Sequence, residues 1–217
     1  MKKLRLFTVL CALAIVACGG KAAAEGAAAS RSKFSFPRPF VNKDPKLKGA
    51  IFAGGCFWCM VSPFEKIKGV KGVISGYSGG KEKNPTYEDV SYGKTGHAES
   101  VLVLYDPQQV SYEKLLDTFW RSINPEQDDG QFYDRGDHYK TYIFYDTKEE
   151  KNAAEKSKAE VAASGKYTRI AVQVKEAKEF WPAEDYHQDY YKKNPAQYYQ
   201  YYNGSGRKAY IESKWGR

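Results

Sequence analysis

The sequence predicts a single α/β (α+β) domain in which helices pack in two layers on a mixed sheet. The chain has 217 residues, of which 42% are hydrophobic and 15% aromatic, and this is enough for one domain with a substantial core. Short apolar runs of strand type alternate along it with segments of helical periodicity. Such alternation is typical of domains whose helices pack on a sheet. We expect the ferredoxin-like, plait-type version of this architecture.

The predicted strands are short runs rich in β-branched and aromatic residues. They cover residues 50–53, 72–77, 101–105, 138–145 and 168–174. The run 101–105 is apolar almost throughout, which predicts a strand buried on both faces of the sheet. Glu99 precedes this run, and in a strand its side chain would point to the same face as those of Val101 and Val103. A carboxylate at the mouth of a buried strand is costly unless it has a partner or a function.

The predicted helices follow the strands in the chain. A short capped helix or tight turn is expected at 84–90, an amphipathic helix at 111–123, a long capped helix at 147–165 and a last helix at 185–194, ended by Pro195. The segment after Cys59 allows two arrangements, a helix that kinks at Pro63 or one that restarts at Ser62 in a capping box. The tail, residues 197–217, is rich in Tyr, Gly and Lys.

The N-terminus has the pattern of an export signal. Residues 1–17 combine a basic start with an apolar run that is too short to span a membrane. Small residues then lead to Cys18, which resembles the lipidation site of a bacterial lipoprotein; the alternative is a plain secretory signal with an incidental cysteine. Residues 18–47 are interpreted as a lipid-anchored flexible tether and lead-in, and 48–217 as the catalytic domain with its aromatic tail. We therefore expect an exported, membrane-anchored protein facing the periplasm or the cell exterior.

The charge pattern argues against nucleic acid as a partner. The net charge of +8 includes Lys2, Lys3 and Arg5 of the expected signal, and the remaining charges of both signs are interspersed. The sequence contains no arginine-rich stripe that could follow a phosphate backbone. We expect a monomer with a solvated surface of mixed charge.

The chemistry is centred on residues 54–59, Gly-Gly-Cys-Phe-Trp-Cys, directly after the first predicted strand. Glycine permits a sharp turn, and a thiol at such a strand-to-helix corner lies beside unpaired backbone N–H groups. Those groups and the helix dipole should lower the pKa of Cys56. Phe57 and Trp58 would wall this thiol with apolar surface, which suits a small apolar group on a substrate. The alternatives are an inert buried cysteine and half of a zinc site.

Cys56 and Cys59 would be the only free thiols after export, because Cys11 lies in the signal and Cys18 would carry lipid. Two thiols three residues apart in an exported domain are not a disulfide scaffold, and redox activity is the better interpretation. A zinc site would need further ligands, and the histidines are scattered along the chain (His97, His138 and His187). We therefore expect neither a metal nor a cofactor.

A series of segments, in order, resembles the A-type peptide methionine sulfoxide reductases. The segments are Gly54-Gly55-Cys56-Phe57-Trp58, Ser75-Gly76-Tyr77 with Gly79-Gly80, Asn84-Pro85-Thr86-Tyr87, Gly93 with Thr95-Gly96-His97-Ala98-Glu99, Asp134-x-Gly136-x-x-Tyr139, and Ala183-Glu184-Asp185-Tyr186-His187-Gln188 followed by Lys193-Asn194-Pro195. The resemblance spans residues 50–195. It implies a peptide-methionine (S)-S-oxide reductase, which repairs oxidised proteins and peptides and also accepts the free amino acid.

The resemblance also implies a role for each polar residue of the site. Cys56 would attack the sulfoxide sulfur as a thiolate, and Glu99, kept protonated by burial, would give its proton to the sulfoxide oxygen. The hydroxyls of Tyr87 and Tyr139 would hold that oxygen. Asp134 would act through water and hydrogen bonds.

The apolar residues and the second cysteine complete the implied cycle. Phe57 and Trp58 would cradle the substrate S-methyl group and set the choice of epimer. The products would be methionine and a sulfenic acid on Cys56. Many relatives resolve that acid with cysteines near the C-terminus, but this chain has none after Cys59. Cys59 is therefore the candidate resolving thiol, and a thioredoxin-like donor would reduce the resulting disulfide.

Two rival functions fit part of the pattern. The first is an exported CxxC thiol–disulfide oxidoreductase, which shares the cysteine spacing but not the paired glycines or the Phe-Trp insert. The second is a non-catalytic surface lipoprotein that binds peptides through its tyrosines. Sulfoxide turnover that depends on Cys56 would separate both from the reductase.

Overall fold

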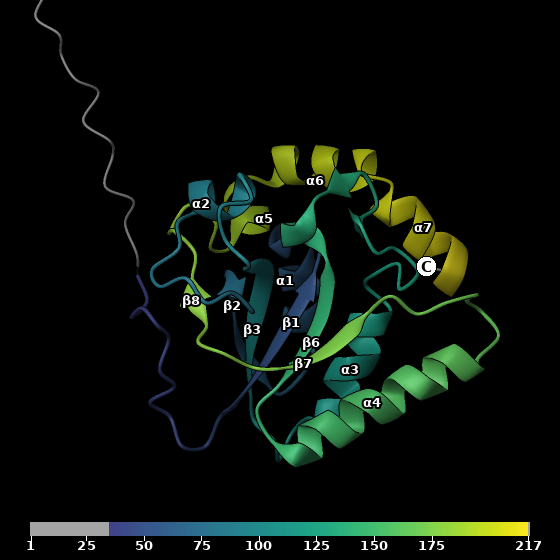
Figure 1. Cartoon of the computed structure of the whole chain (residues 1–217), viewed down its shortest axis with the longest axis horizontal. Helices are drawn as coiled ribbons and strands as arrows, with labels where there is room; N and C mark the ends of the chain where they lie inside the picture. Colours follow the sequence, from purple (N-terminus) through teal and green to yellow (C-terminus); the bar gives the residue numbers. More distant parts are fainter. Residues whose placement is uncertain (1–34, 217) are drawn as a thin grey trace, which may run out of the picture. The chain divides into compact units, whose positions relative to one another are not determined.

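The computed structural model describes residues 35–216, which form a mixed sheet covered by helices (Figure 1). The strands are β1 (Lys48–Gly54), β2 (Val70–Ser78), β3 (Ala98–Tyr105), β4 (Gly130–Gln131), β5 (Asp134–Arg135), β6 (Thr141–Tyr145), β7 (Gln173–Glu176) and β8 (Trp181–Pro182). The helices are α1 (Phe57–Glu65), α2 (Tyr87–Ser91), α3 (Tyr112–Trp120), the 3₁₀ turn η1 (Asp137–Tyr139), α4 (Lys148–Ala163), α5 (Tyr190–Lys193), α6 (Pro195–Gly204) and α7 (Arg207–Trp215).

The main sheet has the strand order β7-β6-β1-β3-β2-β8. Neighbouring strands are antiparallel except β6 and β7, which are parallel, so the sheet is mixed. The elements β1-α1-β2-β3-α3-β6 place their strands in the spatial order β6-β1-β3-β2, which is the split βαβ arrangement of ferredoxin-like folds. The prediction of a mixed α/β domain is thereby confirmed.

An aromatic stack fixes helices α1 and α3 on the sheet. Phe52 of β1 is fully buried, and its ring lies 5.1 Å from that of Phe64 in α1 and 5.4 Å from that of Phe119 in α3. Each such aromatic pair contributes about 0.5–1.5 kcal/mol beyond the burial of its area. Because β1 and α1 are held to each other by this stack, the turn between them, which carries the first cysteine, has a fixed geometry.

Helix α1 runs without interruption from Phe57 to Glu65 and contains Pro63. Of the two arrangements left open by the sequence, the structure has the helix that continues through Pro63. Ser62 lies buried inside this helix and does not begin a new one.

The prediction of a last helix at 185–194 that ends at Pro195 is wrong. Only the short helix α5 forms there, and Pro195 is the first residue of α6. A proline has no N–H to donate, but the first residue of a helix needs none, so proline begins helices as readily as it ends them. Residues 195–215 consequently form two helices, α6 and α7, which fold back over the domain (Figure 1).

Two predicted strands are shorter than expected. The run 138–145 begins with the turn η1, and only Thr141–Tyr145 pairs with β1. In the run 168–174, pairing with β6 begins at Gln173, because the N–H of Ala171 donates instead to the carbonyl of Pro125, at 2.7 Å. Alternating apolar residues do not reveal such a loop contact, so both strands were predicted too long.

The predicted signal 1–17, Cys18 and the tether up to residue 34 lie outside the described residues. The rest of the lead-in contacts the folded domain. The N–H of Phe40 donates to the carbonyl of Phe180 at 2.8 Å, and the ring of Phe36 lies 6.3 Å from that of Phe40. Within residues 35–216, none of the helices is both long and apolar enough for a membrane span.

Candidate active site

The turn between β1 and α1 can be made only by glycine. Gly55 has a φ of +79°, which disfavours any residue with a Cβ. A Cβ placed there would also lie 2.5 Å from Cβ of Gln131 and 2.9 Å from Nη2 of Arg207. The backbone can therefore reverse tightly and present the next residue, Cys56, at the start of a helix.

Cys56 and Cys59 lie on one face of the first turn of α1. Cys56 is the N-cap, and the N–H of Cys59 donates to its carbonyl at 3.1 Å. Residues three apart on a helix are neighbours. Both are free thiols, and both are buried, with 4% and 1% of their surfaces exposed.

Glu99 reaches the same turn from the second residue of β3. Its side chain is buried, and Oε2 accepts a hydrogen bond of 3.0 Å from the N–H of Phe57. Burial raises the pKa of Glu99 well above its usual value, the negative charge of Cys56 raises it further, and the Phe57 N–H opposes both. Burial therefore favours the protonated, neutral form of this carboxyl beside the first cysteine.

Tyr87 and Tyr139 converge on this acid from two separate segments. Burial, followed by the charges of Glu99 and Cys56, raises the pKa of Tyr87 to about 12, against a hydrogen bond with Tyr139. Burial and the same two charges also raise the pKa of Tyr139. The N–H of Tyr87 donates to Oε1 of the buried Glu184 at 2.9 Å, which fixes the start of α2. Both phenols remain protonated at neutral pH and can act as hydrogen-bond donors.

Asp134 joins the site through a tyrosine that was not predicted. The hydroxyl of Tyr201, in α6, donates to Oδ2 of Asp134. The same hydroxyl can donate to Cys56 instead, and that hydrogen bond favours the thiolate of the cysteine. The sequence shows a tyrosine-rich tail, but nothing in its spacing indicates that α6 folds back and brings this hydroxyl to the nucleophile.

The predicted aromatic wall is divided between core and surface. Phe57 is 1% exposed, and its ring lies 4.8 Å from that of His187. Trp58 is half-buried; its Nε1 donates to Nδ1 of His187 at 3.1 Å, and its ring stacks on Tyr190 at 3.7 Å. Trp58 therefore presents the accessible part of the wall, and His187 orients it.

The expectation that the turn lowers the pKa of Cys56 is wrong for this structure. Burial raises the pKa of Cys56, and the hydrogen bond and charge of Cys59 raise it further. The N–H of Phe57, one of the backbone groups at this corner, donates to Glu99 instead. The hydrogen bond from Cys56 lowers the pKa of Cys59 in spite of its burial. Of the two thiols, Cys59 is therefore the one that loses its proton more readily.

His97 and His187 have separate structural roles. His97 accepts the N–H of Gly80 at 3.3 Å, and burial lowers the pKa of His187 to about 3, so that residue is neutral at physiological pH. Among residues 35–216 no group of three or more His, Cys, Asp or Glu side chains is arranged to hold a metal ion.

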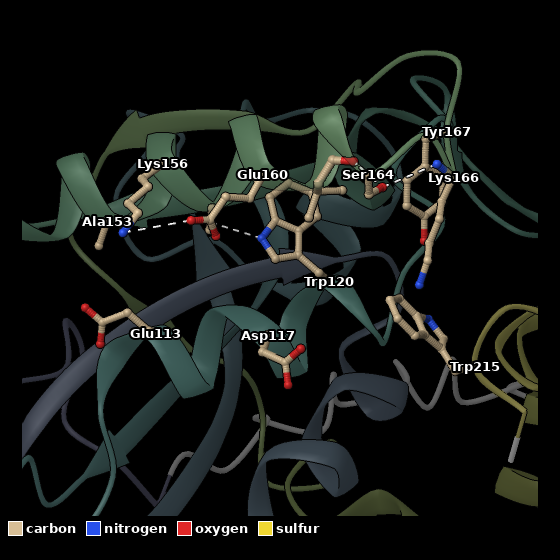
Figure 2. Close-up of a pocket in the computed structure, with 12 residues that line it drawn as sticks. Glu113, Asp117, Trp120, Ala153, Lys156, Glu160, Ser164, Lys166, Tyr167 and Trp215 are labelled. Atoms are coloured by element: carbon tan, nitrogen blue, oxygen red, sulfur yellow. Dashed lines mark hydrogen bonds and ion pairs between the residues drawn. The ribbon is translucent and has the colours of Figure 1, made fainter.

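A separate cavity of about 310 Å³ contains none of the predicted site residues. Figure 2 shows its walls, which come from α3, α4, the end of α7 and the loop after α4. The side chain of Trp215 contributes to it and lies between Arg121 and Lys166, each 4.3 Å from the ring. Its charges are of both signs, and no cysteine is among its lining residues.

Comparisons with known proteins agree with this geometry. The sequence model of the family described as peptide methionine sulfoxide reductase matches residues 48–217. Peptide methionine sulfoxide reductase MsrA 2 of Staphylococcus aureus (strain MRSA252) is 53% identical over 168 residues, which cover 77% of this chain and 95% of the relative. The MsrA enzyme of Listeria monocytogenes (strain CLIP80459) is 49% identical over 170 residues, which cover 78% and 96%.

Solved structures agree as well. Reduced Mxr1 from Saccharomyces cerevisiae has a TM-score of 0.67 and 30% identity, over 71% of this chain and 90% of that one. Methionine sulfoxide reductase A of Corynebacterium diphtheriae has a TM-score of 0.64 and 30% identity, over 73% and 82%. Because the family model matches most of its length and a relative is 53% identical to it, this chain belongs to the peptide methionine sulfoxide reductase family.

Proposed function

We propose that this oxidoreductase reduces methionine-S-sulfoxide, in proteins, in peptides and as the free amino acid, with Cys56 as the nucleophile. The observation that carries the proposal is the buried, neutral Glu99, hydrogen-bonded to the turn that bears Cys56. A sulfoxide sulfur becomes electrophilic when its oxygen is protonated or hydrogen-bonded. A thiol beside a buried acid is the pair that this reaction requires.

The reaction moves one oxygen atom from the substrate to the enzyme. When the sulfoxide enters, Cys56 loses its proton to water, and a hydrogen bond from the Tyr201 hydroxyl stabilises the thiolate that forms. The Cys56 thiolate then attacks the sulfoxide sulfur while Glu99 protonates the oxygen. The oxygen then moves from the substrate sulfur to the Cys56 sulfur, so that the sulfur–oxygen bond of the substrate and the transient sulfur–sulfur bond both break, methionine leaves, and Cys56 carries a sulfenic acid. The substrate sulfur gains the two electrons that Cys56 loses.

The remaining residues have supporting roles in this proposal. Tyr87 and Tyr139, with raised pKa values, donate hydrogen bonds to the sulfoxide oxygen as its charge develops. Asp134 orients the Tyr201 hydroxyl next to Cys56. The apolar surface of Trp58, backed by the buried Phe57, receives the S-methyl group and selects the epimer.

Cys59 resolves the sulfenic acid in this scheme. Its thiolate attacks the Cys56 sulfur and forms a disulfide, and the hydroxide that leaves becomes water with one proton. A thioredoxin-like dithiol then reduces the disulfide with two electrons and restores both thiols. The support is that Cys59 is the only other cysteine among residues 35–216 and lies on the same helical turn.

Cys59→Ser should therefore separate the two halves of the cycle. We expect the variant to form one equivalent of methionine per enzyme at close to the wild-type rate, but to form no intramolecular disulfide and to lose turnover with thioredoxin. Mass spectrometry after a single turnover without reductant distinguishes the products. A wild-type enzyme that accumulates a stable sulfenic acid instead of a disulfide would contradict the role of Cys59.

The thiol–disulfide oxidoreductase alternative is not favoured, because the whole domain matches the sulfoxide reductase family and a neutral acid stands beside the first cysteine. Disulfide exchange requires no such acid. The non-catalytic lipoprotein alternative does not account for a buried acid beside Cys56 either.

We also propose that the enzyme is exported and held on a membrane by lipid on Cys18. The support is the signal-like pattern of residues 1–17 and the small residues before Cys18. Acyl chains bind membranes with about 0.8 kcal/mol for each buried CH₂. In cells given labelled fatty acid, the wild type should carry label and sediment with membranes, whereas Cys18→Ser should carry none. An unlabelled wild-type protein would refute the anchor without affecting the reductase assignment.

A further inference from the structure

A buried arginine from the C-terminal tail lies against the turn that carries the nucleophile. Arg207, the first residue of α7, is 1% exposed. Its Nη2 donates to the carbonyl of Gly54 at 2.8 Å, and its Nη1 donates to the carbonyl of Ser122 at 2.6 Å. Nη1 also lies 3.7 Å from the sulfur of Met60. The guanidinium therefore touches residues on both sides of the segment from Cys56 to Cys59.

The charge of this arginine has no carboxylate partner. Among residues 35–216, no Asp or Glu oxygen lies within 4.0 Å of its guanidinium nitrogens, and its polar contacts are two neutral carbonyls and a thioether. The ring of Phe132 also lies against it, with its centroid 4.5 Å from the guanidinium carbon. A guanidinium keeps its positive charge at working pH. Burying such a charge is strongly unfavourable unless an anion compensates it.

We propose that Arg207 is a positioning residue that holds negative charge on Cys59 and so prepares this cysteine to attack the sulfenic acid on Cys56. The proposal rests on the resolving role proposed for Cys59. The thiolate would be the missing counter-charge of the buried guanidinium. No further group is needed for the step itself, since the thiolate of Cys59 supplies the electron pair of the new sulfur–sulfur bond and hydroxide leaves Cys56.

The other charged groups around Cys59 make such a cation necessary. Burial disfavours its thiolate, and the negative charge of Asp134 does so as well. The hydrogen bond from Cys56 favours the thiolate, but it is lost when Cys56 becomes a sulfenic acid with its proton on oxygen. Arg207 is the positive charge that favours the Cys59 thiolate independently of that hydrogen bond.

The tail also isolates this charge from water. Cys56 and Cys59 form an apolar cluster with Tyr198, against which Tyr201 and Tyr202 pack from the same helix, α6. Because charges interact more strongly when water is excluded, the arginine has a larger effect on the buried sulfur than it would have at a surface. The tail, which lacks resolving cysteines, thus supplies a cation instead.

The test compares neutral and charged replacements of Arg207. Arg207→Met and Arg207→Gln remove the charge, Arg207→Lys retains it, and the control Arg169→Met removes an exposed arginine that pairs with Asp128 at 2.9 Å. The rate of Cys56–Cys59 disulfide formation after one equivalent of sulfoxide is followed against pH, with methionine release measured in parallel. The neutral variants should form the disulfide about tenfold more slowly at neutral pH for each unit by which the pKa of Cys59 rises.

High pH should restore the disulfide rate of the neutral variants, because it ionises Cys59 without the arginine. Arg207→Lys should keep the midpoint of the pH profile near that of the wild type, and Arg169→Met should change nothing. A merely structural role would lower methionine release and disulfide formation together, at every pH. An unchanged midpoint in Arg207→Met and Arg207→Gln would overturn the proposal.

A second measurement needs no change at Arg207. In Cys56→Ser, the pH dependence of Cys59 alkylation is read by mass spectrometry on the peptide that carries it. A midpoint below that of an ordinary cysteine supports the proposal, and one at or above it refutes the proposal even if the neutral variants do not fold. A wild type that forms no disulfide would refute the resolving role of Cys59. A rate of disulfide formation that does not depend on Arg207 would refute only the role proposed for Arg207.

Discussion

Cys56→Ser is expected to abolish reduction of methionine sulfoxide, with kcat falling by about four orders of magnitude or more. A serine hydroxyl in the same buried position is too weakly acidic and too poor a nucleophile to attack a sulfoxide sulfur. The turn itself should be preserved, because Gly54 and Gly55 fix it and the new side chain is of similar size. Methionine release by amino-acid analysis, with both thioredoxin and a small dithiol as reductant, measures the effect.

Cys59→Ser is the matched control for this variant. It also removes one buried thiol from the first turn of α1, but it should still release the first equivalent of methionine. If Cys56→Ser retained turnover above the rate of the reductant alone, the nucleophile would have to be another group. Equal loss of the first turnover in both variants would likewise contradict the separate roles of the two cysteines.

Glu99→Gln is expected to slow the chemical step by about 10²–10⁴-fold, the usual contribution of a positioned general acid. The amide has the shape of the carboxyl and can still accept the N–H of Phe57, but it cannot give a proton to the sulfoxide oxygen. Single-turnover methionine formation isolates this step from recycling. The exposed Glu149→Gln serves as the control, and a Glu99→Gln rate within threefold of wild type would remove the acid from the mechanism.

The same variant should be more stable than the wild type at neutral pH. Since the folded-state pKa of Glu99 is raised, its contribution to stability is complete below the pKa of an unfolded glutamic acid and is lost as the pH rises toward the folded value. Each unit of that difference corresponds to about 1.4 kcal/mol. Urea unfolding should therefore show the advantage of Glu99→Gln growing from acidic to neutral pH. A variant that loses stability relative to the wild type over this range would show that Glu99 is ionised in the folded enzyme.

The parts of the site that the sequence predicts are those defined by local patterns. The glycines before Cys56 predict a sharp turn between strand and helix, and that turn is present. The position of Glu99 on the same strand face as buried apolar residues predicts that its carboxyl is buried. In the structure β3 pairs with β1, and the carboxyl of Glu99 reaches the turn. Both inferences depend only on residues that are close together in the chain.

The parts that could not be predicted depend on long-range contacts. Tyr201 and Arg207 lie more than a hundred residues after Cys56, and they approach it because α6 and α7 fold back. Pro195 suggested the end of a helix, although proline is equally suited to the first position. The pKa of Cys56 was predicted with the wrong sign because Glu99 occupies the N–H of Phe57 and burial then dominates. A motif shows which groups are present, but not which of them compete for one donor.

The most direct test of the central claim is to trap the oxygen-bearing intermediate on Cys56. Cys59→Ser is mixed with one equivalent of a peptide containing either the S or the R epimer of methionine sulfoxide, and a dione that reacts with sulfenic acids is then added. We expect the S epimer alone to yield one equivalent of methionine and one dione adduct, located on Cys56. Methionine formed without an adduct on Cys56, or equal reaction of the R epimer, would contradict it.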